Sequence, residues 1–323
     1  MAIRRADMVF GGARAVIKRT IEISHEAAHL AVKLDQIQLL RHDASVKAPI
    51  ASIPCEDIGL VVVDHPGVTY SHAALARIIE FGGGVLICGR DHLPAGLLLP
   101  MISHTEGVWR IKDQLRASKP LHKRLWQQIV IAKIKAQARN LPSGEVSQGR
   151  LLALAGEVKS GDPSNVEAQA AKIYWGAWLG DRPQAAWFRR RPEGKDPING
   201  MLNYGYAAMR AAVARALVGG GLLPALGIHH KQRGNNFCLA DDLLEPLRPL
   251  VDACVRDLID WNITEIDQRA KKHLLALLTR TVQVGDQMGP LMVGLHRTVA
   301  SLVACLRGES RRLDLPVGVR NDS

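Results

Sequence analysis

Apolar and polar residues alternate in short runs over about the first hundred positions of the chain. Residues 58–63 and 85–88 are apolar, rich in β-branched side chains and bounded by turn-forming residues, which is typical of buried strands. A short run at 20–23 and the partly alternating segment 30–40 indicate further strands. We therefore expect a small β-rich domain over residues 1–100.

One segment inside this domain has the spacing of a helix. Residues 71–81, SHAALARIIEF, lie between the two apolar runs and begin with Ser71, a residue type favoured at helix N-caps. The sequence therefore predicts one strand–helix–strand unit within the β-rich domain.

From Trp109 onward, apolar residues recur at helical spacing. In residues 120–140, one face carries the apolar side chains Leu121, Leu125, Ile129 and Ala132. The basic residues outside that stripe are Lys123, Arg124, Lys133 and Lys135. Further helices are predicted near residues 150–159, 163–179, 197–218, 243–261, 265–279 and 288–306.

These patterns predict an α+β protein. The small β-rich domain is followed by a larger, all-helical catalytic domain at residues 101–308, with the boundary near 95–108. The polar segment 309–323 is expected to be a flexible tail.

The charge balance narrows the class of partner. Hydrophobic residues make up 47% and charged residues 23% of the 323 positions, as in ordinary folded proteins. Lys plus Arg exceed Asp plus Glu by 42 to 31, which favours a polyanionic partner, with nucleic acid ahead of an acidic membrane surface. Aromatic residues are only 4%, so contact with duplex phosphates is preferred over base stacking on single strands.

The cysteines indicate a reducing compartment. All five are scattered, and no two have CxxC spacing, so we interpret them as reduced core residues of a cytoplasmic protein. No stretch is apolar for the roughly 18 residues that a membrane span needs, and the N-terminal residues do not have the pattern of a signal peptide.

One helical segment carries a single candidate ligand. Asp162-Pro163 predicts a helix start, and Glu167 is the one carboxylate in the run that follows. Its helical face is otherwise small and aromatic, so the carboxylate is expected to be partly buried and to need a partner. That partner is either a cation or, in a purely structural role, a Lys or Arg side chain.

A later segment supplies further ligands. His229 and His230 follow directly after an apolar run. Asp242 and Glu245 come later in the segment, three positions apart, so that on a helix both side chains can face one point. Carboxylate oxygens and an imidazole nitrogen from separate segments make a mixed site for a divalent cation, with positions left open for water and phosphate.

Basic residues near these segments are candidates for contacting DNA phosphates. They are Lys231, Arg233, Arg189 and Arg190. The run 189–191 would equally suit a solvated charged segment.

A second metal motif occurs at residues 25–29, His-Glu-Ala-Ala-His, which matches the zinc-protease pattern HExxH. That motif needs a helix to place both histidines on one face. Here it follows a strand candidate, so a turn between strands is the preferred interpretation.

Three stretches also carry a resemblance to a known family. They are EAQAAKIYW at 167–175, NGMLNYGYAAMRA at 199–211 and LPALGIHHKQRGNNFCLADDLLEPLRP at 223–249. In these the chain resembles the metal-dependent integrase (endonuclease) subunit of CRISPR spacer acquisition, in the form associated with type II systems. The N-terminal half resembles that family only in its general character, a small β-rich domain that precedes a helical one.

The resemblance implies three residues that are both catalytic and metal-binding: Glu167, His230 and Asp242. His230 is preferred because it occupies the fourth place of Gly-Ile-His-His, and Asp242 because it directly precedes Leu-Leu-Glu-Pro. His229 and Glu245 stand beside them as supporting candidates. The implied cofactor is Mg²⁺, and Mn²⁺ is expected to substitute because of the histidine ligand.

The implied reaction joins the 3′-OH ends of short DNA duplexes into a CRISPR repeat by transesterification. The implied partners are double-stranded DNA, a second copy of the chain bound through the β-rich domain, and a small CRISPR-associated adaptation protein whose dimer bridges two such homodimers. The RNA-guided effector nuclease is a further candidate partner. Two other functions are compatible with the residues alone: a metal-dependent, structure-specific DNase in repair, and a non-catalytic DNA-binding scaffold.

Overall fold

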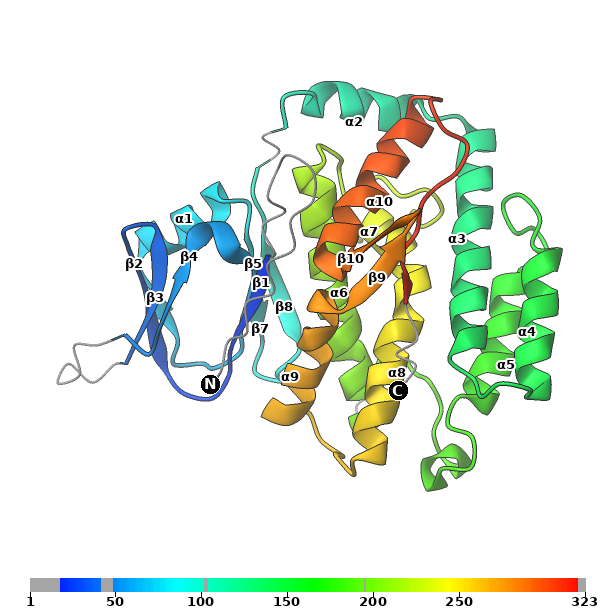
Figure 1. Cartoon of the computed structure of the whole chain (residues 1–323), viewed down its shortest axis with the longest axis horizontal. Coiled ribbons are helices and arrows are strands. Elements are labelled where there is room, and N and C mark those ends of the chain that lie inside the picture. Colours follow the sequence, from blue (N-terminus) through cyan, green and yellow to red (C-terminus); the bar gives the residue numbers. More distant parts are fainter. Residues whose placement is uncertain (1–17, 42–48, 102–103, 195, 319–323) are drawn as a thin grey trace.

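A computed structural model describes residues 18–41, 49–101, 104–194 and 196–318 of the chain. A strand-rich N-terminal region lies beside a mostly helical C-terminal region (Figure 1). Among the described residues, no helix is long and apolar enough to cross a membrane.

The first sheet of the N-terminal region joins the two regions. Its strand order is β1 (Arg19–Ile23), β5 (Ile58–Val63), β7 (Gly84–Cys88) and β8 (Pro94–Leu98). The first three strands are parallel, and β8 is antiparallel to β7. All of β5 is buried, because Leu60 and Val62 face the core of the helical region while Val61 and Val63 face a separate N-terminal core. Burial on both faces explains why this strand is a continuous apolar run rather than an alternating one.

The predicted strand–helix–strand unit is confirmed. Helix α1 (His72–Glu80) connects the parallel strands β5 and β7. Its N-cap is Ser71, whose hydroxyl oxygen accepts a hydrogen bond from the backbone N–H of Ala74 at 3.2 Å.

The second N-terminal sheet has the order β4 (Ala51–Pro54), β3 (Gln36–Arg41), β2 (Ala28–Lys33) and β6 (Thr69–Tyr70). The expected alternating segment 30–40 is thus a hairpin of two strands. Its two-residue turn, Leu34 and Asp35, has positive φ at both positions, which brings Lys33 opposite Gln36. His25 precedes β2 and His29 lies within it, so the two histidines of the HExxH match do not share a helix.

The helices of the C-terminal region are α2 (Gly107–Arg116), α3 (Lys119–Arg139), α4 (Val146–Glu157), α5 (Val166–Ala177), α6 (Pro197–Gly219), α7 (Cys238–Leu244), α8 (Arg248–Asp260), α9 (Gln268–Ala276) and α10 (Leu291–Leu306). Most lie close to the predicted positions, but α2 was not predicted, and the single helix predicted at 243–261 is divided into α7 and α8. Helix α6 is buried over most of its length and packs against α7, α8, α9 and α10. A short 3₁₀ turn, Glu245–Leu247, separates α7 from α8.

The sequence predicted an all-helical C-terminal region, and this prediction is wrong. A small antiparallel sheet has the order β10 (Gln287–Pro290), β9 (Thr281–Val284) and β11 (Val317–Gly318). Strand β9 alternates, with Val282 and Val284 buried in the main core, but four residues are too few to distinguish such a strand from a loop by pattern alone.

The segment after Gly308, expected as a flexible tail, is packed through residue 318. Leu313 and Leu315 belong to the main core, and β11 pairs with β9. Its apolar residues are isolated among polar and charged ones, so they show no periodicity from which burial could be predicted.

Candidate metal-binding site

Glu167 lies in the first turn of α5. Asp162 supports that helix start, because its carboxylate accepts hydrogen bonds from the backbone N–H groups of Val166 at 2.8 Å and Glu167 at 3.0 Å. The side chain of Glu167 is 25% exposed and forms an ion pair with Lys133 of α3. The structural alternative considered for this residue, pairing with a basic side chain, is therefore what the structure contains.

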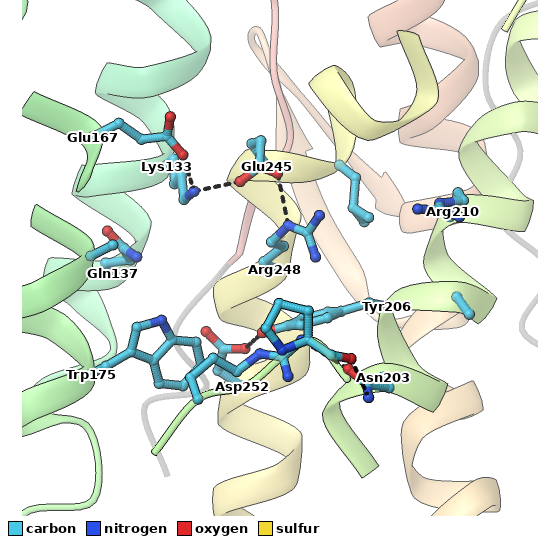
Figure 2. A pocket seen from close by; sticks show the side chains of 15 residues that line it. Lys133, Gln137, Glu167, Trp175, Asn203, Tyr206, Arg210, Glu245, Arg248 and Asp252 are labelled. Atoms are coloured by element: carbon cyan, nitrogen blue, oxygen red, sulfur yellow. Dashed lines mark hydrogen bonds and ion pairs between the residues drawn. The ribbon is translucent and has the colours of Figure 1, made fainter. Parts of the chain in front are cut away.

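The ammonium of Lys133 bridges two carboxylates (Figure 2). Its Nζ lies 2.5 Å from Oε1 of Glu167 and 2.5 Å from Oε2 of Glu245. Burial lowers the pKa of Lys133, but the two negative charges outweigh it and the pKa is raised overall. The bridge joins α3, α5 and the 3₁₀ turn after α7, three elements that are separated in the sequence.

Glu245 is the more deeply enclosed of the two carboxylates. Arg248 donates from Nε to its Oε1 at 2.9 Å, while Lys133 holds Oε2. Burial alone raises the pKa of Glu245, but the charges of Arg248 and Lys133 lower it to about 2. Glu245 is therefore ionised at neutral pH although it is buried.

Both carboxylates line a cleft of about 440 Å³. Its polar and charged lining residues are Lys133, Gln137, Glu167, Arg190, Asn203, Tyr206, Arg210, Glu245, Arg248 and Asp252. Four of these are cations, so the cleft can hold an anion such as a phosphate beside the carboxylates. Figure 2 shows Glu167 and Glu245 on either side of Lys133, with Arg248 between Glu245 and Tyr206.

The floor of the cleft is a buried hydrogen-bonded group around Asp252. The hydroxyls of Tyr174 and Tyr206 each donate to one of its carboxylate oxygens. Burial raises the pKa of Asp252 to about 6, against the opposing effect of these hydrogen bonds. Arg190 and Arg248 lie over the ring of Tyr206, which connects this group to the cations of the cleft.

The other two predicted site residues form a separate pair. Nδ1 of His230 lies 2.6 Å from Oδ1 of Asp242, a carboxylate that is fully buried in α7. Asp242 also accepts from the backbone N–H groups of Ile228 at 2.6 Å, His229 at 3.0 Å and His230 at 3.2 Å. The hydrogen bond to Asp242 raises the pKa of His230.

Asp242 therefore fixes the loop at residues 227–230, called here the histidine loop. Gly227 is required at its start, because a Cβ there would lie 2.3 Å from the carbonyl oxygen of His230. A carboxylate that holds one ring nitrogen of a histidine fixes the ring and leaves the other nitrogen for a metal ion. His229 stacks on Trp126, with ring centroids 4.0 Å apart, and so belongs to the wall of the loop.

Not all three predicted ligands meet. In the part of the chain that the structure describes, Glu167, His230 and Asp242 do not bring a ligand atom each within 4.8 Å of one another. The carboxylate that does meet Glu167, across Lys133, is Glu245, which the sequence analysis named as a supporting candidate.

One three-residue group does satisfy that distance, and it consists of Cys254, Asp257 and His273. It does not suit Mg²⁺, because burial raises the pKa of the Cys254 thiol to about 12, and a protonated thiol is a poor ligand for a hard cation. We therefore place the candidate metal site at the paired carboxylates of the cleft.

The predicted DNA-contacting residues divide between cleft and surface. Arg190 lines the cleft and donates to Asn199 and Asn203 of α6. Arg189, Lys231 and Arg233 are exposed. Sequence reasoning did not identify Lys133, Arg210 or Arg248. Lys133 lies in the apolar stretch IVIAKIKA, where a buried charge must be paired, but Lys135 in the same stretch is exposed, so the sequence does not show which of the two lysines is buried.

Comparisons with known proteins agree on one family. The family described as "CRISPR associated protein Cas1" matches residues 21–282. A CRISPR-associated endonuclease Cas1 from Neisseria meningitidis serogroup C is 36% identical over 270 residues, which cover 82% of this chain and 86% of that protein.

Solved structures share the fold. A casposase bound to integration product has a TM-score of 0.73 at 19% identity, with 92% of each chain covered. A chain of a Cas6-RT-Cas1–Cas2 complex has a TM-score of 0.74 at 18% identity, covering 98% of this chain and 38% of that one.

Proposed function

The chain belongs to the Cas1 family of CRISPR-associated proteins, and on this premise we propose that it is a metal-dependent DNA endonuclease and integrase of CRISPR adaptation. It joins the 3′-OH ends of short DNA duplexes into a CRISPR repeat. One observation carries the proposal at the level of residues: Glu167 and Glu245 converge on a single cation inside a cleft lined by arginines.

The residues fit a divalent cation. Two carboxylate oxygens, one from Glu167 and one from Glu245, converge on a single positive charge, and carboxylate oxygens are ligands that Mg²⁺ prefers. Glu167 and Glu245 would hold the ion. Nε2 of His230, whose ring Asp242 orients, is the proposed third ligand; among the described residues these three side chains do not bring a ligand atom each within 4.8 Å of one another. The sequence instead predicted that Asp242 is itself a ligand. Mn²⁺ titration of Asp242→Asn distinguishes these two ligand sets.

A bound cation would polarise a non-bridging oxygen of the phosphodiester whose phosphorus is attacked, and would stabilise the negative charge that develops there. Mg²⁺ is the proposed ion, and Mn²⁺ should replace it because manganese accepts the same mixture of oxygen and nitrogen ligands.

The protein's own side chains position the DNA. Arg190, Arg210 and Arg248 can donate to non-bridging phosphate oxygens, which would fix the scissile phosphodiester against the carboxylates. The nucleophile is the 3′-OH of the incoming duplex, so no protein nucleophile is needed. One phosphodiester bond forms as another breaks, and the strand that leaves carries away a 3′-OH.

The proposed assembly extends beyond one chain. The similarity to a chain of a Cas1–Cas2 complex supports a small adaptation protein as partner. We propose that the chain forms a homodimer through the strand-rich region, that a dimer of the small protein bridges two homodimers, and that the RNA-guided effector nuclease takes part in choosing DNA. The surface residues Arg189, Lys231 and Arg233 would contact duplex phosphates.

A strand-joining assay tests the function. The purified protein and its small partner are mixed with a short duplex bearing free 3′-OH ends and a repeat-bearing plasmid, in Mg²⁺ or in EDTA. We expect covalent insertion only in Mg²⁺, with a loss of at least about 100-fold in Glu167→Gln because a ligand is removed. Glu157→Gln, an exposed carboxylate at the end of α4, is the matched control and should keep full joining.

The other outcomes identify the alternatives. Metal-dependent cutting without insertion would indicate the repair DNase. DNA that is bound but unchanged in the presence of metal would indicate the non-catalytic scaffold.

A further inference from the structure

Lys133 occupies the position where the two carboxylates of the site converge. Its Nζ is 2.5 Å from an oxygen of each carboxylate, so the ammonium and a divalent cation cannot both fill this gap. Lys133 is not part of the residue set that the family resemblance implied, and its side chain is only 11% exposed.

The charges around this gap already balance. Glu167 and Glu245 carry two negative charges, while Lys133 and Arg248 contact them with two positive ones. Arg210 is paired separately, donating from Nε to Asp241 at 2.7 Å. A divalent cation entering this arrangement adds two positive charges to a neutral, partly buried group, which is unfavourable at low dielectric.

A DNA phosphate in the cleft would change that balance. Lys133 lines the same cleft as Arg190, Arg210 and Arg248, so its flexible stem gives the ammonium access to an anion bound there. Movement of the ammonium toward a phosphate would release Glu167 and Glu245 to the metal and would supply a compensating negative charge.

We propose that Lys133 is a positioning residue that competes with the divalent cation for Glu167 and Glu245, so that metal and DNA bind cooperatively. Without DNA the ammonium holds the carboxylates in their paired geometry and keeps metal affinity low. With DNA the same ammonium contacts a phosphate. This inference rests on the proposed function of the same site.

The test measures Mn²⁺ binding rather than joining. Binding of Mn²⁺ to the full-length protein is titrated by electron paramagnetic resonance and by calorimetry, alone and with a duplex whose 3′ ends are dideoxy, so that no reaction occurs. For the wild type we expect the duplex to tighten Mn²⁺ binding by about ten-fold, within the usual range of coupling between sites.

Lys133→Met keeps the apolar stem and removes the charge. We expect it to bind Mn²⁺ about ten-fold more tightly than the wild type without DNA, and to lose most of the effect of the duplex. Lys135→Met changes an exposed lysine of the same helix, two residues away, and should behave as the wild type. A purely structural ion pair predicts the opposite sign, because two unpaired carboxylates would separate and bind metal more weakly.

A second measurement protects the test if Lys133→Met is unstable. Thermal unfolding with and without Mn²⁺ should show a larger stabilisation by Mn²⁺ in Lys133→Met than in the wild type, because the metal replaces the missing charge. Equal or smaller stabilisation in the variant would overturn the inference.

The outcomes separate this inference from the function on which it rests. If the wild type binds no Mn²⁺ with or without the duplex, the proposed metal site itself is wrong. If the wild type binds Mn²⁺ but neither Lys133→Met nor the duplex alters its affinity, the proposed metal site is supported and the proposed competition between Lys133 and the metal is wrong.

Discussion

Two buried lysines of this protein are held by carboxylates, and their surroundings differ. Lys133 bridges Glu167 and Glu245 at the wall of a cleft, and Glu167 remains 25% exposed. Lys271 of α9 pairs with Asp64, which follows β5, and their side chains are only 7% and 1% exposed. The first pair faces a space that a ligand can enter, whereas the second is sealed between the strand-rich and helical regions.

The difference shows that an ion pair does not by itself indicate a functional site. Asp64 also contacts Nδ1 of His92, a residue of the same strand-rich region, at 3.0 Å, so one carboxylate oxygen contacts His92 and the other contacts Lys271. Glu167 and Glu245 instead share a single ammonium next to three arginines. Access from the cleft and the convergence of two carboxylates on one ammonium, rather than the pairing itself, distinguish the candidate metal site.

Removing the sealed lysine should produce the largest effect on stability. Lys271→Met leaves Asp64 buried without its main counter-charge, and breaking a buried pair in this way typically costs about 3–5 kcal/mol. Chemical denaturation should show this loss to the same extent with and without Mn²⁺. Lys272→Met, an exposed neighbour on the same helix, is the control and should stay within about 0.5 kcal/mol of wild type. Rescue of Lys271→Met by Mn²⁺ would remove the distinction between the two pairs.

Acid should weaken the cleft pair in a defined pH range. The pKa of Glu245 is lowered from 4.5 to about 2 by Arg248 and Lys133 against the effect of burial. Its contribution to stability is therefore complete above pH 4.5 and is lost as the pH falls from there through about 2, to a total of about 3 kcal/mol.

The measurement compares the free energy of unfolding of wild type and Glu245→Gln between pH 6 and pH 2. The variant should lose stability less steeply below pH 4.5, because the amide does not titrate. Parallel curves would show that Glu245 is not the ionised partner of Lys133.

The smallest expected effect concerns the histidine loop. Asp242→Asn removes an acceptor for the backbone N–H groups of Ile228 and His229, so the orientation of His230 loosens. Loss of such an outer partner commonly lowers metal affinity by about 10–100-fold. Mn²⁺ titration should show this partial loss, with a larger one in Glu245→Gln. If Asp242→Asn loses Mn²⁺ as completely as Glu245→Gln, Asp242 is a direct ligand, as the sequence analysis predicted.

Much of the architecture follows from local patterns. The start of α1 at Ser71 and the long helices α3 and α6 agree with the predicted ranges, because each has an N-cap residue or a regular apolar period, and β5 agrees because it is a continuous apolar run. The C-terminal sheet was missed for the opposite reason. Its strands are two to four residues long and gain their partners only from distant segments.

Lys133 shows what the sequence pattern cannot predict about a single side chain. It lies outside the apolar stripe of α3, a position that ordinarily faces water, yet it is buried against two other elements. Helical periodicity states which residues share a face, but it does not state what packs over the remaining surface.

The sequence by itself determined the chemical types available to this protein: an excess of basic residues, the adjacent histidines His229 and His230, and several carboxylates on or near helices whose positions could be predicted. Only the tertiary structure decided which of them meet. Glu245 faces Glu167 because the 3₁₀ turn after α7 packs against α3, where Lys133 lies 112 positions away in sequence. Asp242, three residues earlier, points instead at the histidine loop. Such choices depend on packing between distant segments, which local periodicity does not encode.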